Sequence, residues 1–147
     1  MINKNHLNAS NPQTATVQLK ALAEHEQPEV RSRVAENPRS PLALLSSLTW
    51  DNAPEVRASV ASNPNVSMAL LKWLVHDESG DVRYALAEDP TLPMSLLQEL
   101  SCDANVFVAA RAIQTIDNIK RERTRTQPCQ VCTAKHQAIT DTDEPAN

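Results

Sequence analysis

Two cysteines and a histidine near the C-terminus have a spacing that could bind a metal ion. Cys129 and Cys132 are separated by two residues, and His136 follows four residues after the second cysteine. Two thiolates at this spacing can bind one zinc ion, and the histidine could be a third ligand. A closed zinc site needs four ligands, and no fourth is obvious unless Cys102 folds back or two chains share the ion. The alternative is a pair of free thiols in a polar tail, which is the more common case for such a motif.

Three arginines recur at a constant interval of 26 residues: Arg31, Arg57 and Arg83. A row of guanidinium groups could bind the carboxylates or phosphates of a partner through paired hydrogen bonds. Three aspartates recur at the same interval: Asp51, Asp77 and Asp103. Because every arginine has an aspartate at the same distance along the chain, we favour a structural interpretation, in which each arginine pairs with an aspartate in a loop between units. The three arginines remain candidates for partner binding.

Four aromatic residues occur in the chain, and three of them interrupt a repeated position. Trp73 stands where neighbouring units have Ser47 and Glu99, so we expect its side chain to be exposed. Exposed aromatic side chains are typical of protein interfaces, and Trp73 is therefore the preferred partner-binding residue. Trp50 and Tyr84 are further candidates. For Trp50 the alternative is a large side chain that its neighbours half cover.

A short basic cluster occupies residues 120–125, with the sequence Lys-Arg-Glu-Arg-Thr-Arg. It could contact phosphates or an acidic partner, although cations near the C-terminus of a helix also complement the helix dipole. No combination of serine, cysteine, histidine and carboxylate residues has a spacing typical of a catalytic site. The chain has one glycine, Gly80, which excludes the glycine-rich loops that bind nucleotides. We therefore expect a protein that is not an enzyme.

The elements that must position these residues follow from a repeat of 26 residues. The phrase Ala-x-Asn-Pro, with Asp in place of Asn in its last copy, occupies residues 9–12, 35–38, 61–64 and 87–90. Apolar residues keep the same interval in three columns: Val30, Val56, Val82 and Val108; Leu19, Leu45, Leu71 and Leu97; Leu22, Leu48, Leu74 and Leu100. A strict period of this length predicts stacked helical units that share one core.

One unit, residues 27–51, illustrates the structure that we expect. Pro28 suits the first position of a helix. The Asn-Pro pair at residues 37–38 should end that short helix after about two turns, with Asn37 in the left-handed conformation. A second, longer helix should begin near Pro41. Its inward stripe should consist of Leu42, Leu45 and Leu48, with Leu44 beside it.

The two ends of the repeat depart from this pattern in opposite ways. Polar residues replace the apolar positions of the first unit, so we expect a polar cap whose first short helix is missing or frayed. At the other end, apolar residues at helical spacing predict a longer amphipathic helix that covers the last unit: Val108, Ala112, Ile113, Ile116 and Ile119. Beyond Thr124 no apolar period continues, and we expect a flexible tail.

The phrase Glu-Val-Arg-x-x-Val-Ala-x-Asn-Pro at residues 29–38, followed by Pro-x-x-Leu-Leu-x-x-Leu at 41–48, resembles the leucine-rich repeat variant family and is similar to short HEAT-like repeats. The resemblance covers residues 9–113 and implies a right-handed superhelix of alternating helices. It also implies a binding role, since most members bind proteins, whereas a few bind nucleic acid or modify a cofactor. The iron–sulfur cysteine cluster known in that family has no counterpart here, because residues 1–100 contain no cysteine.

Composition and charge restrict the class of function. Residues 1–118 contain nine Lys and Arg against fourteen Asp and Glu, a net charge of −5, whereas a non-specific nucleic-acid binder normally has a basic stripe. No apolar run approaches the ~20 residues that cross a membrane. Three cysteines are too few for a disulfide framework, so we expect a cytoplasmic protein.

These observations predict an all-α fold: a right-handed α-solenoid of about four 26-residue repeats in residues 1–118, with a C-terminal capping helix that ends in a tail within residues 119–147. The predicted function is a protein-binding adaptor or inhibitor with no catalysis, no membrane contact and no cofactor apart from the suggested zinc ion. One alternative is a nucleic-acid-binding regulator that uses the arginine column and the basic cluster. The other is a metal-dependent dimer joined through the Cys-x-x-Cys tail.

Overall fold

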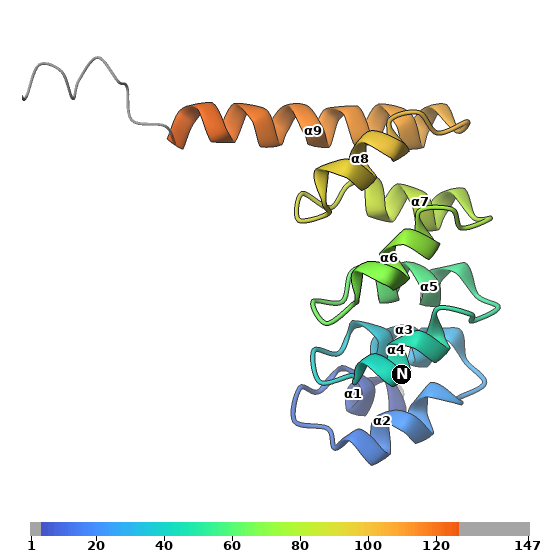
Figure 1. Ribbon diagram of the computed structural model, residues 1–147. Helices are drawn as coiled ribbons and strands as arrows, with labels where there is room; N and C mark the ends of the chain where they lie inside the picture. Colours follow the sequence, from blue (N-terminus) through green and yellow to red (C-terminus); the bar gives the residue numbers. More distant parts are fainter. Residues whose placement is uncertain (1–3, 127–147) are drawn as a thin grey trace, which may run out of the picture. The chain divides into compact units, whose positions relative to one another are not determined.

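The computed structural model describes residues 4–126, and all regular structure within them is helical (Figure 1), which confirms the all-α prediction. The chain divides into two units, Met1–Ile116 and Asp117–Asn147. The described residues form nine helices: α1 (Lys4–Ser10), α2 (Thr16–Ala23), α3 (Pro28–Glu36), α4 (Leu42–Leu48), α5 (Pro54–Ala61), α6 (Met68–Leu74), α7 (Gly80–Ala87), α8 (Met94–Leu100) and α9 (Val106–Thr126). The last ten residues of α9 belong to the second unit.

Prolines mark the start of four helices of the first unit. Pro28 and Pro54 are the first residues of α3 and α5, where the missing N–H would have no partner in any case. Pro41 and Pro93 stand directly before α4 and α8, because a proline further inside would break the helical ladder. The prediction that the second helix of a unit is longer than the first is wrong. α3 has nine residues and α4 has seven, since Pro41 delays the start of the second helix.

The corner between α3 and α4 is held by a side chain rather than by a left-handed residue. Asn37 has φ −66° and ψ 124°, and no described residue other than glycine has a positive φ, so the predicted left-handed conformation is wrong. The buried Asn37 amide donates to the carbonyl oxygens of Ala9 (2.7 Å) and Asn11 (3.0 Å), and its Oδ1 accepts from the backbone N–H of Arg39 (2.9 Å). One side chain thus joins its own corner to the preceding corner.

The same arrangement recurs one period later, and we call the set the asparagine ladder: Asn37, Asn63 and Thr115. The Asn63 amide donates to the carbonyl oxygens of Ala35 and Asn37. Thr115 donates its hydroxyl to the Ala87 carbonyl oxygen at 2.7 Å. The position between them is Asp89, whose carboxylate cannot donate and instead accepts from the N–H and hydroxyl of Thr91. The ladder therefore lacks one step, between α5 and α7.

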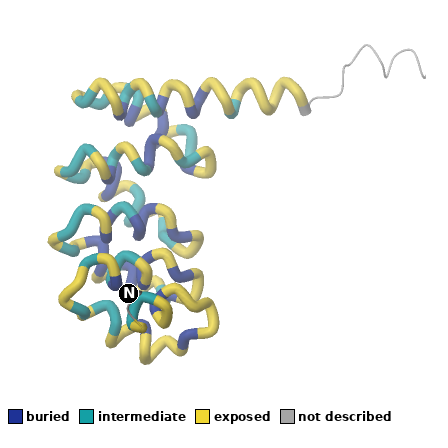
Figure 2. Tube along the Cα trace, turned by 180° about the vertical axis from the view of Figure 1, so that it is seen from behind, coloured by how far each residue is buried: buried dark blue, intermediate teal, exposed yellow. Residues whose placement is uncertain are grey.

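The apolar columns of the sequence form the core of the first unit. All four valines of the column that begins at Val30 are at most 1% exposed, and Leu19, Leu45 and Leu97 are fully buried, whereas Leu71 is only half-buried. Figure 2 shows that buried residues recur in each layer of helices of this unit. α3 packs on α1 and α5, and α5 packs on α7, while α2, α4, α6 and α8 each contact their sequence neighbours among those helices. Adjacent helix pairs therefore share one core.

Three expectations about helix faces and ends are wrong. The polar segment at the start does form a helix, α1, because the buried Ala9 packs it on α3. Leu42 is 49% exposed, since the buried stripe of α4 centres on Leu44, Leu45 and Leu48, and Leu42 lies roughly a third of a turn away. Ile113 is also 49% exposed. It continues the column of four buried alanines (Ala9, Ala35, Ala61 and Ala87) that the next helix pair covers, and the described residues contain no helix pair after α9.

Replacing Asp89 with asparagine should add the missing step of the asparagine ladder. The new amide could donate to the carbonyl oxygens of Ala61 and Asn63, while its Oδ1 keeps the bonds from Thr91. We expect Asp89→Asn to stabilise the protein by about 1 kcal/mol and to raise the thermal midpoint by about 3 °C. The matched control is Asn63→Asp, which should lower the midpoint. Equal midpoints for Asp89→Asn and the parent protein would contradict this account of the ladder.

Candidate functional site

The arginine column forms a continuous chain of ion pairs, which we call the arginine–aspartate ladder (Arg31–Asp51, Arg57–Asp77 and Arg83–Asp103). In each pair the arginine Nε lies 2.7 Å from the aspartate Oδ2, and Nη2 binds Oδ1 at 2.7 to 3.1 Å. Such two-point pairing is the strongest geometry that a guanidinium and a carboxylate can adopt. The predicted pairing between repeated arginines and aspartates is confirmed.

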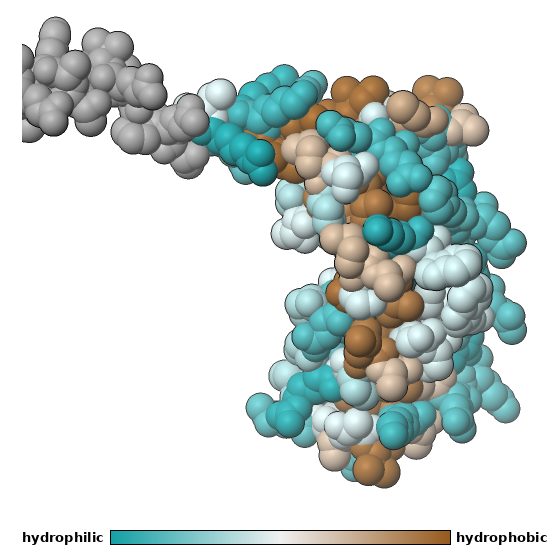
Figure 3. All heavy atoms as spheres, viewed as in Figure 1, coloured by the Kyte–Doolittle hydropathy of each residue, from teal (hydrophilic) through white to brown (hydrophobic). Residues whose placement is uncertain are grey.

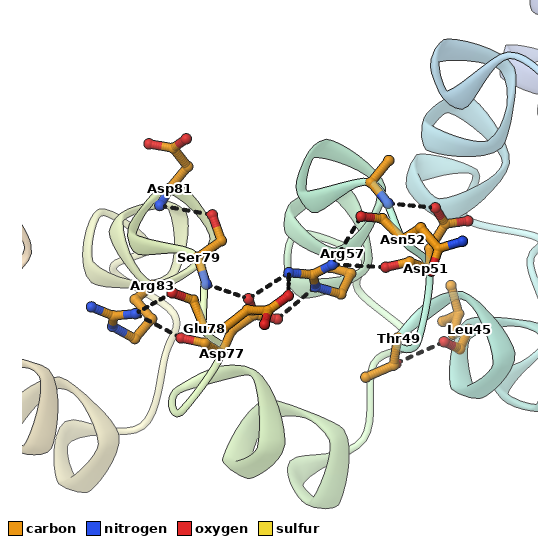
Figure 4. Close-up of polar contacts among 11 residues, drawn as sticks. Leu45, Thr49, Asp51, Asn52, Arg57, Asp77, Glu78, Ser79, Asp81 and Arg83 are labelled. Carbon is orange, nitrogen blue, oxygen red and sulfur yellow. Dashed lines mark hydrogen bonds and ion pairs between the residues drawn. The ribbon is translucent and has the colours of Figure 1, made fainter.

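The remaining donors of the arginines connect one pair to the next. Nη1 of Arg57 donates to the carbonyl oxygen of Asp51 (2.7 Å), and Nη1 of Arg83 donates to the carbonyl oxygen of Asp77 (Figure 4). Each aspartate also accepts the backbone N–H two residues later, as Asp77 does from Ser79 at 2.8 Å. The arginine side chains are only 9 to 18% exposed. Their donors are thus committed inside the protein, which leaves little for binding the phosphates or carboxylates of a partner.

The pKa of each group in the ladder shifts toward its charged form. Burial alone would raise the pKa of the Asp77 carboxyl, but the hydrogen bonds from Arg57 and from the Ser79 N–H outweigh burial and lower it below 3.8. The pKa of Asp51 falls for the same reasons. For Asp103 the hydrogen bond from Arg83 is the main cause of the lowered pKa. The hydrogen bond to Asp77 raises the pKa of Arg57.

Two exposed tryptophans of the described residues lie in contact with each other. Trp50 is 68% exposed and Trp73 is 62% exposed. Their rings meet edge to face, with centroids 5.5 Å apart and an interplanar angle of 62°. The predicted exposure of Trp73 is confirmed. The alternative for Trp50, a side chain half covered by its neighbours, is wrong.

A surface pocket of about 440 Å³ opens beside the two rings, and we call it the tryptophan pocket. Its wall combines Trp50 and Trp73 with the Arg57–Asp77 pair, and Asp51, His76 and Glu78 also line it. Figure 4 shows the polar part of this wall, between the end of α4 and the loop after α6. The ladder fixes both loops, so the residue next to Asp51, which is Trp50, is held in place.

The charge of the tryptophan pocket is negative. Three carboxylates line it against one guanidinium, that of Arg57, which already pairs with Asp77. Asp51 is likewise paired, with Arg31. Glu78 differs, because its side chain is 88% exposed and touches Arg57 only at 3.5 Å. The carboxylate of Glu78 is therefore the group at the mouth of the pocket that is available to an incoming cation.

A second pocket of similar size shares one lining residue, Asp51, with the tryptophan pocket. Its other lining residues come from α2, α4 and the residue after α2. They include the apolar Ala43 and Leu44 and the charged Lys20 and Glu24. Figure 3 shows an apolar band on this side of the first unit, flanked by polar atoms. Because Asp51 lines both pockets, we call the two pockets together the groove.

Of the other predicted site residues, Tyr84 does not line this groove. Tyr84 is 38% exposed on α7, and the guanidinium of Arg111 lies 5.9 Å from the centre of its ring while pairing with Glu88. The basic cluster at residues 120–125 belongs to the second unit. Cys129, Cys132 and His136 lie outside the described residues. Within residues 4–126 no three potential metal ligands gather, and Cys102 is an exposed free thiol.

Sequence reasoning missed one exposed apolar pair. Val106 and Phe107 begin α9 and are 75% and 78% exposed. In the register of the repeat, Phe107 follows Glu29, Glu55 and Asp81, which all stand in the first turn of a helix. Aligning the units by sequence shows an aromatic residue at a position where the other units have an acidic residue, and this difference could have predicted the exposure of Phe107.

Comparison of the chain with protein-family models, with curated proteins and with solved structures gives no match. Among the described residues, no helix combines the length and the apolar character that crossing a membrane requires.

Removing one charge of the ladder should destabilise the protein strongly. The Arg57 and Asp77 side chains are 9% and 8% exposed, so Asp77→Asn leaves a largely buried guanidinium without its counter-charge. We expect a loss of about 3 kcal/mol in the free energy of unfolding, measured by urea titration. The control is Glu36→Gln, which breaks the exposed Arg33–Glu36 pair and should cost about 1 kcal/mol or less. Similar losses in the two variants would argue against the ladder as a constraint.

The lowered aspartate pKa values predict a loss of stability in acid. The folded protein holds Asp51, Asp77 and Asp103 ionised below their ordinary pKa of 3.8. This contribution is complete above that pH and disappears as the pH falls through the lower pKa values of the folded state. The thermal midpoint should therefore fall steeply below about pH 4. The free energy of unfolding of Asp77→Asn should fall less steeply with pH than that of the parent protein, with a slope smaller by at most about 1.4 kcal/mol per pH unit. Identical slopes would contradict this prediction.

Proposed function

We propose that this chain is a short right-handed α-solenoid of about four 26-residue repeats that acts as a protein-binding adaptor or inhibitor without catalysis. The groove beside Trp50 and Trp73 is the surface that holds the partner. The observation that carries the proposal is the exposure of both indole rings on a surface that internal packing does not explain. Tryptophans in such positions are the residues that most often dominate the energy of a protein interface.

The way in which the rings are held also supports binding. Trp50 lies directly before Asp51, whose carboxylate binds Arg31 and the Ala53 N–H. Trp73 belongs to α6, and the loop after that helix is fixed by Asp77. Because these loops are already ordered, binding costs little conformational entropy for ordering them. Preorganised surfaces of this kind bind more tightly.

The charges of the groove favour a protein partner over nucleic acid. The arginine column, on which the nucleic-acid alternative partly rests, uses its donors within the ladder. The carboxylate of Glu78 stands at the mouth of the pocket, where it would repel a phosphate backbone. Tryptophan rings surrounded by a polar rim are typical of protein interfaces.

Removing one indole should weaken partner capture without unfolding the protein. Trp73 is 62% exposed, so Trp73→Ala should leave the thermal midpoint nearly unchanged. We expect it to weaken binding by at least about 2 kcal/mol, roughly 30-fold. The measurement is affinity purification from the native host, with nuclease-treated and untreated extracts compared by quantitative mass spectrometry. Val17→Ala, which removes a 78% exposed side chain on α2, is the matched control. The same captured proteins with Trp73→Ala, Trp50→Ala and the parent protein would refute the proposed surface.

A further inference from the structure

We infer that the tryptophan pocket receives an arginine or lysine side chain from an extended basic segment of the partner protein. This inference rests on the proposed function and specifies the chemistry of the partner. The faces of tryptophan rings attract cations more strongly than those of any other side chain, and a guanidinium can also stack on them. Trp50 and Trp73 leave most of their surface open to solvent at the pocket.

The carboxylates of the pocket select the sign of the ligand. Asp51 and Asp77 are each held by an arginine of the ladder, but Glu78 is 88% exposed and makes only a 3.5 Å contact with Arg57. A cation that enters between the rings and Glu78 would be attracted by both. A neutral apolar group would instead shield Glu78 from water without replacing the lost interaction.

The guanidinium of Arg57 is not free to bind an anionic ligand in the pocket. Arg57 gives Nε and Nη2 to Asp77 and Nη1 to the carbonyl oxygens of Asp51 and Asn52. Its side chain is 9% exposed. A phosphate or carboxylate could therefore bind Arg57 only by displacing an internal ion pair. The acidic balance of residues 1–118 adds a longer-range attraction for a basic segment.

The second pocket indicates a segment rather than a single side chain. It shares Asp51 with the tryptophan pocket, and Ala43 and Leu44 are among its apolar lining residues. A chain that places its cation at the rings can lay a neighbouring apolar residue against them. Lys20 and Glu24 both line the second pocket, so their opposite charges give no reason for a second cation there.

Tryptophan fluorescence provides a direct test, because Trp50 and Trp73 are the only tryptophans of the chain. The probes are short glycine–serine peptides that carry arginine, glutamine or glutamate at the same positions. We expect a saturable change in emission with the arginine peptide and binding at least roughly tenfold weaker for the glutamine peptide. The arginine peptide should also bind more weakly as the salt concentration rises. Equal binding of the three peptides, or the tightest binding by the glutamate peptide, would overturn the inference.

Variants separate the contributions of the rings and the carboxylate. Trp73→Phe should retain most of the affinity for the arginine peptide, whereas Trp73→Leu should lose roughly tenfold, with Trp50 still serving as the reporter. Glu78→Gln should weaken binding and reduce its dependence on salt. Glu55→Gln, an exposed glutamate in the first turn of α5, is the control and should bind like the parent protein. Equal affinities of the Glu78→Gln and Glu55→Gln variants for the arginine peptide would show that the Glu78 carboxylate does not contribute to binding.

The outcome also separates this inference from the proposed function. If the arginine peptide does not bind but Trp73→Ala still loses its captured proteins, the partner is not basic and the protein-binding role stands. If the arginine peptide does not bind and Trp73→Ala keeps its captured proteins, the inference and the proposed function are both wrong. Sedimentation of the chain alone should show a monomer. A dimer that Trp73→Ala dissociates would assign the pocket to a second copy and overturn the inference.

Discussion

The two-point pairing of an arginine on one helix with an aspartate in the loop after the next helix is the constraint on which the rest of the structure depends. Asp51 receives Arg31 through its carboxylate and Arg57 through its carbonyl oxygen, and Asp77 repeats this role for Arg57 and Arg83. Largely buried ion pairs add little net stability, because desolvation offsets most of the attraction. They do penalise any other alignment of the units, since a shifted unit would leave a charge without its partner. The pairs therefore mainly specify how the units align and add little to the stability of the fold.

A second ladder restrains the opposite edge. The Asn-Pro corners lie on one side of the first unit and the aspartate loops on the other (Figure 1). The asparagine ladder ties corner to corner through buried amides, and the arginine–aspartate ladder ties loop to loop. Between them the valine and leucine columns supply the apolar burial that stabilises the stack, at about 1.5–3 kcal/mol for each fully buried side chain. Apolar contact has no preferred direction, whereas hydrogen bonds do, so the two ladders keep successive units in register.

A surface constrained in this way can carry side chains that contribute nothing to packing. Trp50, Trp73 and Phe107 all occupy positions where other units have small or polar residues, and all three are strongly exposed. The arginine–aspartate ladder holds Asp51, the residue after Trp50, so the fold does not depend on burial of the indole ring. Function in such a chain is expected where the repeat is interrupted, because the repeated residues are already occupied with holding the units together.

Periodicity in the sequence was enough to determine the helical class, the columns of the core and the pairing of repeated arginines with repeated aspartates, because each of these depends on spacing along the chain. It also identified Trp73 as exposed. The relative lengths of α3 and α4, the extended backbone of Asn37, the exposure of Leu42 and the contact between Trp50 and Trp73 depended on packing between units. A conformation that one side chain imposes by bonding to the preceding unit, or a ring contact between residues of adjacent units, has no signature in local propensity. Tertiary structure alone decided these features.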